Sequence, residues 1–205
     1  MFFGAKTPKI FQAIFPSLVW ENETTEKKVW FTFDDGPTAE VTPFVLDTLK
    51  KNNVKATFFC LGEQIEKHPE IFQRIKTEGH DIGNHSFSHT NGFTTCTKKY
   101  LKDIEKCQNL IPETKLFRPP FGNIYPWQIS RLKKDFKIIM WDVIAWDFDK
   151  NTSKEKCFLN VVNNVENGSI ILLHDNKKAQ ENLQYALPKI IETLKERAFT
   201  FSATW

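Results

Sequence analysis

The stretch Thr32-Phe33-Asp34-Asp35-Gly36-Pro37 decides how this chain is interpreted. The β-branched and aromatic residues at 29–33 are typical of a buried strand. The Gly36-Pro37 pair then turns the chain immediately. Two neighbouring carboxylates therefore lie where a strand ends. Because desolvating both is costly unless a cation or a proton compensates, this point of the chain predicts a metal site or a proton-handling site.

Two histidines are the natural partners for such a carboxylate pair. His85 and His89 lie in the segment Asn84-His85-Ser86-Phe87-Ser88-His89. Their i, i+4 spacing predicts that both rings lie on one side of a helical turn. Histidines and a carboxylate form the usual ligand set of a catalytic zinc, which keeps one coordination position open for water.

Length and composition bound the class of protein. A chain of 205 residues, 40% of them hydrophobic, with 19 Phe and 6 Trp, fits one globular domain with a sizeable core. The net charge is +3 and no basic block occurs, so a nucleic-acid partner is not expected. No apolar run is long enough for a transmembrane segment, and no signal peptide is recognisable, which favours a cytoplasmic protein.

The four cysteines form no CxxC pair. We expect Cys60, Cys96, Cys107 and Cys157 to be free thiols, with a disulfide between two of them as the alternative.

Short apolar runs and amphipathic segments alternate along the chain. This alternation predicts an α/β fold with a parallel sheet, whose strands are buried on both faces. We expect one domain over 1–205, in which 1–27 form an N-terminal extension packed on a barrel at 28–200. A helix at 8–15 is expected to cover one end of the core. Strands are predicted at 29–33, 56–61, 81–83, 116–118, 138–141, 169–173 and 199–201, and further helices at 42–52, 69–78, 98–110, 127–134, 153–164 and 179–195.

Polar motifs follow the ends of these predicted strands. In a parallel barrel the carboxyl ends of the strands share one face, and that face carries the active site. The motifs concerned are Asp34-Asp35, His85 with His89, Arg118, Asp142 with Asp147, and His174.

Taken together, these motifs resemble those of the polysaccharide deacetylases, carbohydrate esterase family four. This family includes chitin, chitooligosaccharide and peptidoglycan N-acetylglucosamine deacetylases and some acetylxylan esterases. The resemblance covers about residues 28–200 and implies a distorted (β/α)7 barrel of parallel strands with outer helices. Its motifs stand here as TFDDGP at 32–37, HSxxH at 85–89, RxPxG at 118–122 and LxH at 172–174.

The resemblance implies metal-dependent hydrolysis of the N-acetyl group of an amino sugar in a glycan, with release of acetate. Zinc is the expected metal, and cobalt, nickel or manganese are alternatives that such a site accepts. A metal would lower the pKa of its water and polarise the acetyl carbonyl. The sequence alone does not say which aspartate binds the metal. The resemblance assigns Asp35, His85 and His89 as ligands, Asp34 as general base, His174 as acid, Arg118 as the partner of Asp34, Leu172 as the lining of the acetyl pocket, and the segment Pro120-Phe121 as a substrate contact with a backbone N–H for the oxyanion.

The fourth motif departs from the family pattern W-S-x-D-x-x-D-W. The chain reads WDVIAWDF at 141–148, so the first aspartate of the pattern, which usually pairs with the catalytic histidine, is replaced by Ile144. This puts the tuning of His174 in doubt. We predict that Asp147, which the family keeps, or Asp142, on the same strand face as Ile144, partners His174 or Arg118. Asp147 is favoured.

Two alternative functions stay open at this stage. An O-deacetylase resembling acetylxylan esterases would use the same machinery, and a non-catalytic glycan-binding barrel would keep only the fold. The complete set of aspartates and histidines argues against the second. Tyr125, Trp127 and Trp146 follow strand ends and either stack on sugar rings or pack in the core, whereas His68 and His80 belong to no motif and are interpreted as structural.

Overall fold

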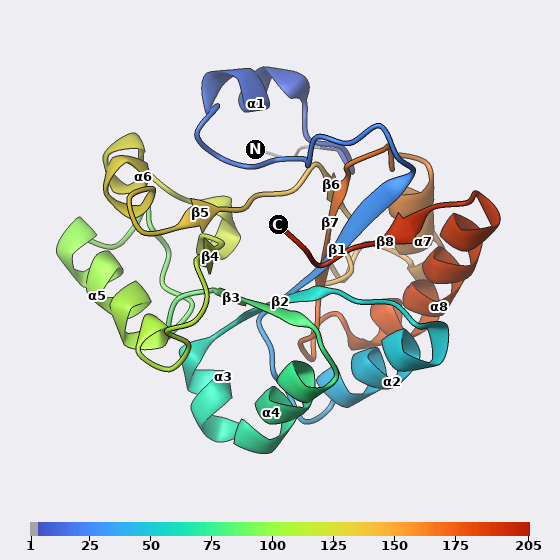
Figure 1. Ribbon diagram of the computed structural model, residues 1–205, viewed down its shortest axis with the longest axis horizontal. Helices are drawn as coiled ribbons and strands as arrows, with labels where there is room; N and C mark the ends of the chain where they lie inside the picture. Colours follow the sequence, from blue (N-terminus) through green and yellow to red (C-terminus); the bar gives the residue numbers. More distant parts are fainter. Residues whose placement is uncertain (1–3) are drawn as a thin grey trace.

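The computed structural model describes residues 4–205, in which a parallel sheet curls around a central axis inside a layer of helices (Figure 1). The strand order is β5-β4-β3-β2-β1-β7-β6, and β8 pairs with β1 on the side. This arrangement confirms the predicted distorted (β/α)7 barrel. The strands are β1 (Lys28–Asp34), β2 (Thr57–Cys60), β3 (Asp81–Asn84), β4 (Leu116–Phe117), β5 (Lys137–Ile138), β6 (Val143–Ile144), β7 (Ile170–His174) and β8 (Thr200–Phe201).

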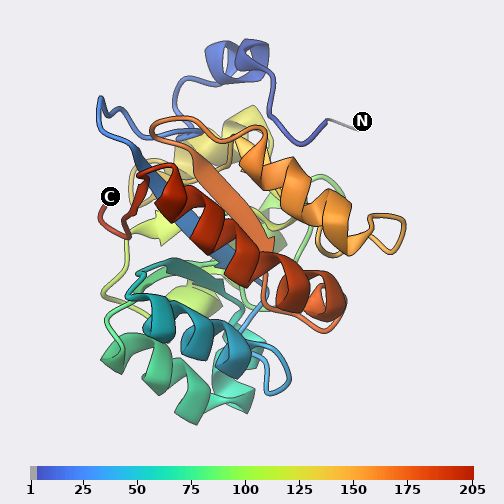
Figure 2. The ribbon, with the colours of Figure 1, turned by 90° about the vertical axis from the view of Figure 1, so that its right-hand side faces the viewer.

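The helices connect successive strands and cover the outside of the sheet. Figure 2 shows α7 and α8 lying side by side outside β1 and β7. Within residues 4–205, no helix combines the length and the apolar character needed to cross a bilayer. The helices are α1 (Lys9–Ile14), α2 (Thr42–Asn52), α3 (Gly62–Lys67), α4 (Pro69–Thr77), α5 (Thr97–Gln108), α6 (Pro126–Leu132), α7 (Lys154–Val162) and α8 (Gln180–Glu196), with a 3-10 turn η1 at Pro120–Gly122.

Strand β1 is the centre of the sheet. It pairs with β2 on one side and with β7 on the other, and its residues from Val29 to Asp34 are buried. Phe31 and Phe33 pack into the main hydrophobic core between the sheet and the outer helices. Because the side chains of a strand alternate between its two faces, Thr32 points to the other face, into the barrel, where its hydroxyl contacts Arg118. The prediction of a strand buried on both faces is confirmed.

One α-helix and one strand, besides the 3-10 turn η1, were not predicted from the sequence. Helix α3 buries only Gly62 and Ile65, so its six residues carry too little apolar periodicity to be recognised. Strand β6 has only two residues, and its pairing with β7 places Ile144 opposite Leu172. Such a short element is defined by its neighbour in the sheet.

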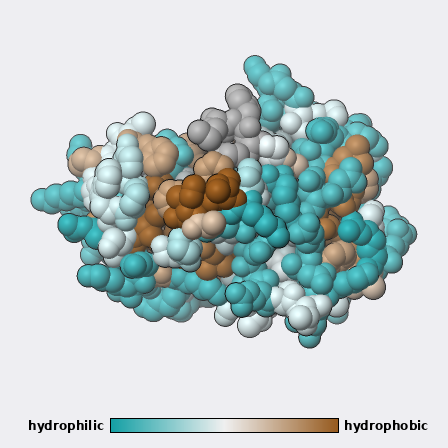
Figure 3. All heavy atoms as spheres, turned by 90° about the horizontal axis from the view of Figure 1, so that it is seen from above, coloured by the Kyte–Doolittle hydropathy of each residue, from teal (hydrophilic) through white to brown (hydrophobic). Residues whose placement is uncertain are grey.

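The N-terminal segment fills the gap between β5 and β6. Val19 pairs with Ile139 beyond β5, and Lys6 pairs with Val143 of β6. Helix α1, between these two contacts, buries none of its residues. The expectation that the helix at 8–15 covers the core is therefore wrong for Ile10 and Ile14, whereas Phe15, at its end, packs against the core cluster that contains Leu18. Ile10 and Ile14 are 62% and 57% exposed, and a hydrophobic patch lies on the α1 side of the molecule (Figure 3).

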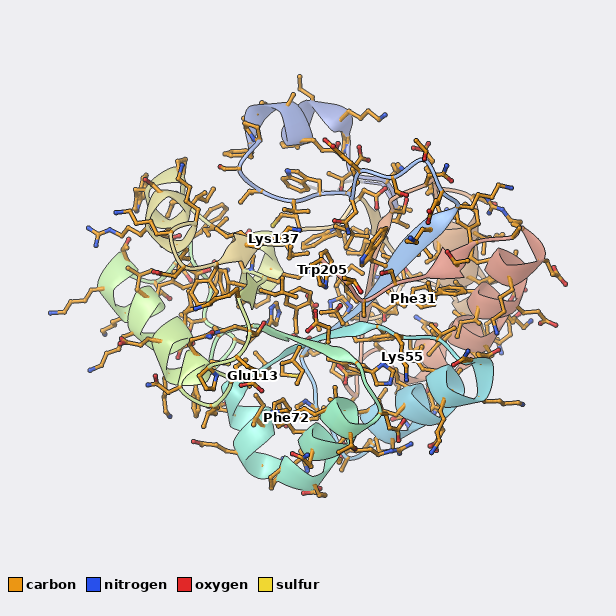
Figure 4. All side chains as sticks on the ribbon, in the orientation of Figure 1. Phe31, Lys55, Phe72, Glu113, Lys137 and Trp205 are labelled. Carbon is orange, nitrogen blue, oxygen red and sulfur yellow. The ribbon has the colours of Figure 1, made fainter. Side chains whose placement is uncertain are left out.

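The amino ends of the strands are closed by two tryptophans. Trp30 donates its indole N–H to the carbonyl of Thr204 at 2.8 Å, and Trp205 donates to the hydroxyl of Thr57 at 2.9 Å. The two indole rings are 6.4 Å apart. Trp205 lies near the middle of the ring of strands in Figure 4. This end of the barrel is thus filled with apolar side chains.

All four cysteines are free thiols, which confirms the first of the two expectations. Cys60, Cys107 and Cys157 are buried and Cys96 is exposed. Burial raises the pKa of the Cys107 thiol to about 12, so it remains a neutral core residue.

Candidate active site

The carboxyl ends of the strands surround a pocket of about 280 Å³. Its walls bring together polar side chains that come from widely separated parts of the chain, as predicted for a parallel barrel. The rest of the wall is formed by aromatic rings, Gly122, Ile144, Leu172 and Lys178. The polar lining residues include Asp34, Asp35, His85, His89, His174 and Asn176.

The chain directs Asp34 and Asp35 to one pocket by changing its backbone conformation between them. Asp34 is the last residue of β1, whereas Asp35 has a left-handed φ of 81°. Continuing the strand would point the second carboxylate to the opposite face. A positive φ is strained for a residue other than glycine, and such strain is concentrated at functional sites.

The two histidines lie on a loop after β3, not on a helical turn. The expectation of helical geometry is wrong because Ser86 and His89 adopt left-handed φ values of 66° and 55°. The two rings still lie close together, with centroids 5.2 Å apart. The i, i+4 spacing thus found the pair but attributed its proximity to the wrong backbone conformation.

The histidine loop is anchored by polar side chains at its base. Asn84 accepts the N–H of Ser86 at 2.8 Å. Asp103 on α5 accepts the backbone N–H groups of Phe87 and Ser88 at 3.0 and 3.1 Å. Burial acts to raise the pKa of Asp103, but the hydrogen bonds from Ser88 outweigh it and lower the pKa. The sequence analysis did not identify Asn84 or Asp103 as anchors. Neither hydrogen bonds to an asparagine at the start of a loop nor those to an aspartate on a later helix produce a recognisable sequence pattern.

Asp35, His85 and His89 form a cluster whose ligand atoms all lie within 4.8 Å of one another. Oδ1 of Asp35 is 3.5 Å from Nε2 of His85 and 3.1 Å from Nε2 of His89. The same Oδ1 atom is buried without a hydrogen-bond partner. Nδ1 of His85 is 2.8 Å from the carbonyl of Arg118, so the N–H donates there and Nε2 keeps its lone pair for the cluster.

This donor set fits a divalent metal ion. Two imidazole nitrogens and one carboxylate oxygen converge, and a buried unpartnered oxygen points into their midst. Burial raises the cost of charging Asp35, but the adjacent His85 and His89 outweigh it and hold the pKa of the carboxyl well below its usual range. The ligand is therefore in the ionised form that metal binding requires.

Asp34 is held by a fully buried arginine. Nη1 of Arg118 donates to Oδ1 of Asp34 and to the hydroxyl of Thr32, both at 2.7 Å, and Nη2 donates to the carbonyl of Met140 at 2.8 Å. The guanidinium also lies over the ring of Phe59, with Cζ 4.1 Å from the centroid. The other oxygen, Oδ2 of Asp34, is left 3.7 Å from Nε2 of His85, beside the metal cluster.

His174 has a carboxylate partner despite the altered fourth motif. Asp147 accepts both the backbone N–H of His174 at 2.7 Å and its Nδ1–H at 2.9 Å. The contact to Nδ1 leaves Nε2 for the pocket. Burial alone would lower the pKa of His174, but the Asp147 carboxylate outweighs it and raises the pKa to about 9. Of the two predicted aspartates, Asp147 therefore makes the contact, and Ile144 does not deprive the histidine of its partner.

Asp142 lies outside this network. Its carboxylate binds Lys6 at 3.0 Å and the hydroxyl of Ser169 at 2.8 Å. It precedes β6 rather than belonging to it, so the strand alternation used to place it beside Ile144 does not apply. Asp142 joins the N-terminal segment to the barrel.

The predicted substrate contacts occupy different positions. Leu172 lies in the pocket wall, and Phe121 lies at the rim with its ring 4.3 Å from that of His89. Phe121 is 60% exposed and has a left-handed φ of 60°. Pro120 is buried and is not among the described residues that line the pocket.

Asn176 is a further pocket residue that no motif indicated. Its side-chain amide donates to Oδ2 of Asp35 at 2.6 Å. This bond occupies the oxygen that faces away from the histidines and leaves Oδ1 for the cluster. His80, by contrast, accepts a backbone N–H from Ala56 in the core, and burial lowers its pKa to about 4, in keeping with the structural role expected for it.

Comparisons with known proteins decide the family. A family model described as polysaccharide deacetylase matches residues 21–136. The chain belongs to the polysaccharide deacetylase family. The prediction of the family, and of a hydrolase that deacetylates a glycan, is thereby confirmed.

Similar proteins cover most of this deacetylase. One peptidoglycan-N-acetylglucosamine deacetylase of Bacillus cereus is 40% identical over 181 residues, which are 85% of this chain and 66% of that protein. Another protein of the same name and organism is 33% identical over 193 residues, 90% of this chain and 89% of its own length. A solved peptidoglycan N-acetylglucosamine deacetylase, in complex with an N-oxidanyl-benzamide, superposes with a TM-score of 0.88 at 37% identity, covering 96% of this chain and 94% of that one.

Proposed function

We propose that this deacetylase hydrolyses N-acetyl groups on the amino sugars of peptidoglycan and releases acetate, with a divalent ion, zinc first, held by Asp35, His85 and His89. The observation that carries the proposal is the convergence of those three residues with Asp34 and His174 in one pocket. The names of the similar proteins support peptidoglycan as the glycan. A cytoplasmic location stays a prediction.

Asp35, His85 and His89 would hold a divalent ion, which when bound would activate a water molecule and polarise the acetyl carbonyl. Asp34 is placed to take the proton from that water as the water oxygen bonds to the carbonyl carbon. Its Oδ2 faces the cluster, while Arg118 orients Oδ1. The buried ion pair with Arg118 orients Asp34, and a general base must lie within hydrogen-bond reach of the proton that it takes.

His174 supplies the proton to the leaving nitrogen when the carbon–nitrogen bond breaks. Asp147 fixes its tautomer and holds it protonated at neutral pH, because the pKa is raised to about 9. An amine leaving group needs this proton more than the alkoxide of an ester does. The well-partnered acid therefore favours N-deacetylation over the O-deacetylase alternative.

The test is an acetate-release assay with peptidoglycan, N-acetylglucosamine oligomers and acetylxylan, with metal ions restored after chelation. We expect acetate from the two N-acetylated substrates, with peptidoglycan preferred. Release from acetylxylan alone would establish the O-deacetylase instead. The matched control is His85→Ala, which removes one metal ligand and should release no acetate from any substrate.

A further inference from the structure

Three aromatic residues form an exposed group that takes no part in the pocket described above. Phe93 and Trp127 are 47% and 55% exposed, and Tyr125 lies between them. The rings of Tyr125 and Trp127 stack nearly parallel, at 13° with centroids 4.3 Å apart, and Phe93 contacts Tyr125 at 4.7 Å. We call Phe93, Tyr125 and Trp127 the aromatic platform. None of the three belongs to a hydrophobic core cluster of the described residues.

The loop that carries His89 and the loop that carries Phe121 run side by side to the platform and contact each other at every second residue. They are in contact first through the rings of His89 and Phe121, with centroids 4.3 Å apart. Two residues further along each loop, Asn123 donates its side-chain amide to Asn91 at 3.3 Å.

The next step, again two residues along each loop, is the contact between Phe93 and Tyr125. Four residues span at most about 14 Å when extended. The platform therefore lies within about 14 Å of His89 and Phe121 at the rim of the pocket, a distance of no more than a few sugar rings.

The platform is held rigidly by a buried glutamine. Gln128 is fully buried, donates its side-chain amide to the carbonyl of Gly92 at 3.1 Å and accepts the N–H of Tyr125 at 2.8 Å. It thereby joins the two loops immediately beside Phe93 and Tyr125. Trp127 is fixed separately, because its indole N–H donates to the hydroxyl of Thr97 at 3.1 Å. A surface whose rings are already ordered binds a ligand with little further loss of side-chain entropy.

We propose that the aromatic platform binds a distant sugar of the same glycan chain whose acetyl group enters the pocket. The inference rests on the proposed function, since it takes the substrate to be a glycan. A pyranose ring presents a flat face of C–H groups, and an exposed, oriented aromatic ring offers the matching apolar surface with a polar edge. An extended chain passing over Phe121 reaches the platform, so long substrates gain a contact that short ones lack.

The experiment compares the disaccharide and the hexasaccharide of β-1,4-linked N-acetylglucosamine. The variant is Trp127→Ala, the matched control is Leu159→Ala, which truncates an exposed apolar residue on α7, and Trp127→Phe is the conservative variant. We expect Trp127→Ala to lower kcat/KM for the hexasaccharide about tenfold, as loss of a central aromatic contact does. The disaccharide should be unaffected, Trp127→Phe should retain most of the activity, and Leu159→Ala should match the wild type.

Two results would overturn the platform: an unchanged kcat/KM for the hexasaccharide, or an equal loss for both substrates. Circular dichroism and the metal content of Trp127→Ala show whether an equal loss of kcat/KM for both substrates comes from misfolding of the variant. Binding of the hexasaccharide, followed by calorimetry, keeps this test independent of the proposed function. If the wild type releases no acetate but binds the hexasaccharide more tightly than Trp127→Ala, the proposed chemistry fails and the platform stands. If wild type and Trp127→Ala bind the hexasaccharide equally tightly, the platform does not bind a sugar and the proposal is wrong.

Discussion

The two ends of the barrel are built from the same strands but from opposite kinds of residue. At the amino ends, Trp30 and Trp205 close the barrel and satisfy their indole N–H groups on nearby oxygens. At the carboxyl ends, Asp34, Asp35 and His174 line an open pocket. Apolar burial at one end contributes stability, whereas gathering charges at the other end reduces it unless each charge is partnered. The difference indicates that one end maintains the fold and the other performs the chemistry.

Strained backbone conformations are also distributed unequally between the pocket end and the closed end of the barrel. Seven residues other than glycine have a positive φ in the described part of the chain. Two of these, Asn53 and Ala198, follow helix ends, where a left-handed residue is common. The other five surround or support the pocket: Asp35, Ser86, His89, Phe121 and Trp146. The pocket end thus stores strain that the closed end does not.

Replacing Asp34 with Asn is expected to have the largest effect on chemistry. The variant keeps the shape of the side chain but removes the base, so turnover should fall by about 10²–10⁴-fold. Because Asp34 is not in the Asp35–His85–His89 cluster, elemental analysis should still find the metal. Near-normal turnover in this variant would leave Asp34 with a structural role only.

Trp30→Ala tests the closed end. Trp30 is buried, and its truncation should lower the free energy of unfolding by about 3–5 kcal/mol, as large core truncations do. Trp127→Ala is the matched control, since it removes the same side chain from a half-exposed site and should cost only about 0.5–1.5 kcal/mol, the contribution of its stacking on Tyr125. Denaturant unfolding measures both. If the folded Trp30→Ala protein also lost affinity for metal, the two ends would not be independent.

Asn176→Ala tests how Asp35 is positioned at the pocket end. The amide of Asn176 holds Oδ2 of Asp35, and loss of a hydrogen bond to a metal ligand typically lowers metal affinity about 10–100-fold. Competition with a chelator gives the affinity directly, without an activity assay. The matched control is Asn182→Ala, whose amide contacts backbone carbonyls of 147 and 152 instead. Equal affinity in wild type and Asn176→Ala would show that Asp35 is positioned without this bond.

Asp147→Asn is expected to show its effect most clearly in the pH dependence. Burial lowers the pKa of His174, and Asp147 raises it to about 9, above its ordinary value of 6.5. Protonated His174 is the active acid, so activity should fall as pH rises through about 9 in the wild type. Without the carboxylate the pKa falls, and this alkaline limb should move to lower pH. The same pair stabilises the fold fully below about 6.5 and loses that contribution as pH rises through about 9.

The control for this prediction is Asp142→Asn, because Asp142 binds Lys6 and not His174. Its alkaline limb should coincide with that of the wild type. Coincident profiles for all three proteins would mean that His174 works without help from Asp147.

The parts of the fold and site that could be predicted are those with local signals. Strand β1 and the carboxylates that end it follow from a run of buried residue types and a Gly-Pro turn. The sequence leaves two candidate partners for His174, Asp142 and Asp147. The choice between them depends on where β6 begins and on the left-handed φ of 58° at Trp146. Asn176 lies in no motif, and its bond to Asp35 exists only once β1 and β7 are paired.

We propose that one divalent ion, held by Asp35, His85 and His89, is required for acetate release. The direct measurement is acetate release from peptidoglycan by metal-stripped protein as zinc is added back, with bound zinc determined on the same samples. We expect no release without the ion, a rise in proportion to bound zinc up to one equivalent, and neither activity nor stoichiometric zinc in His85→Ala. Undiminished release by the stripped protein, or one equivalent of zinc in His85→Ala, would contradict it.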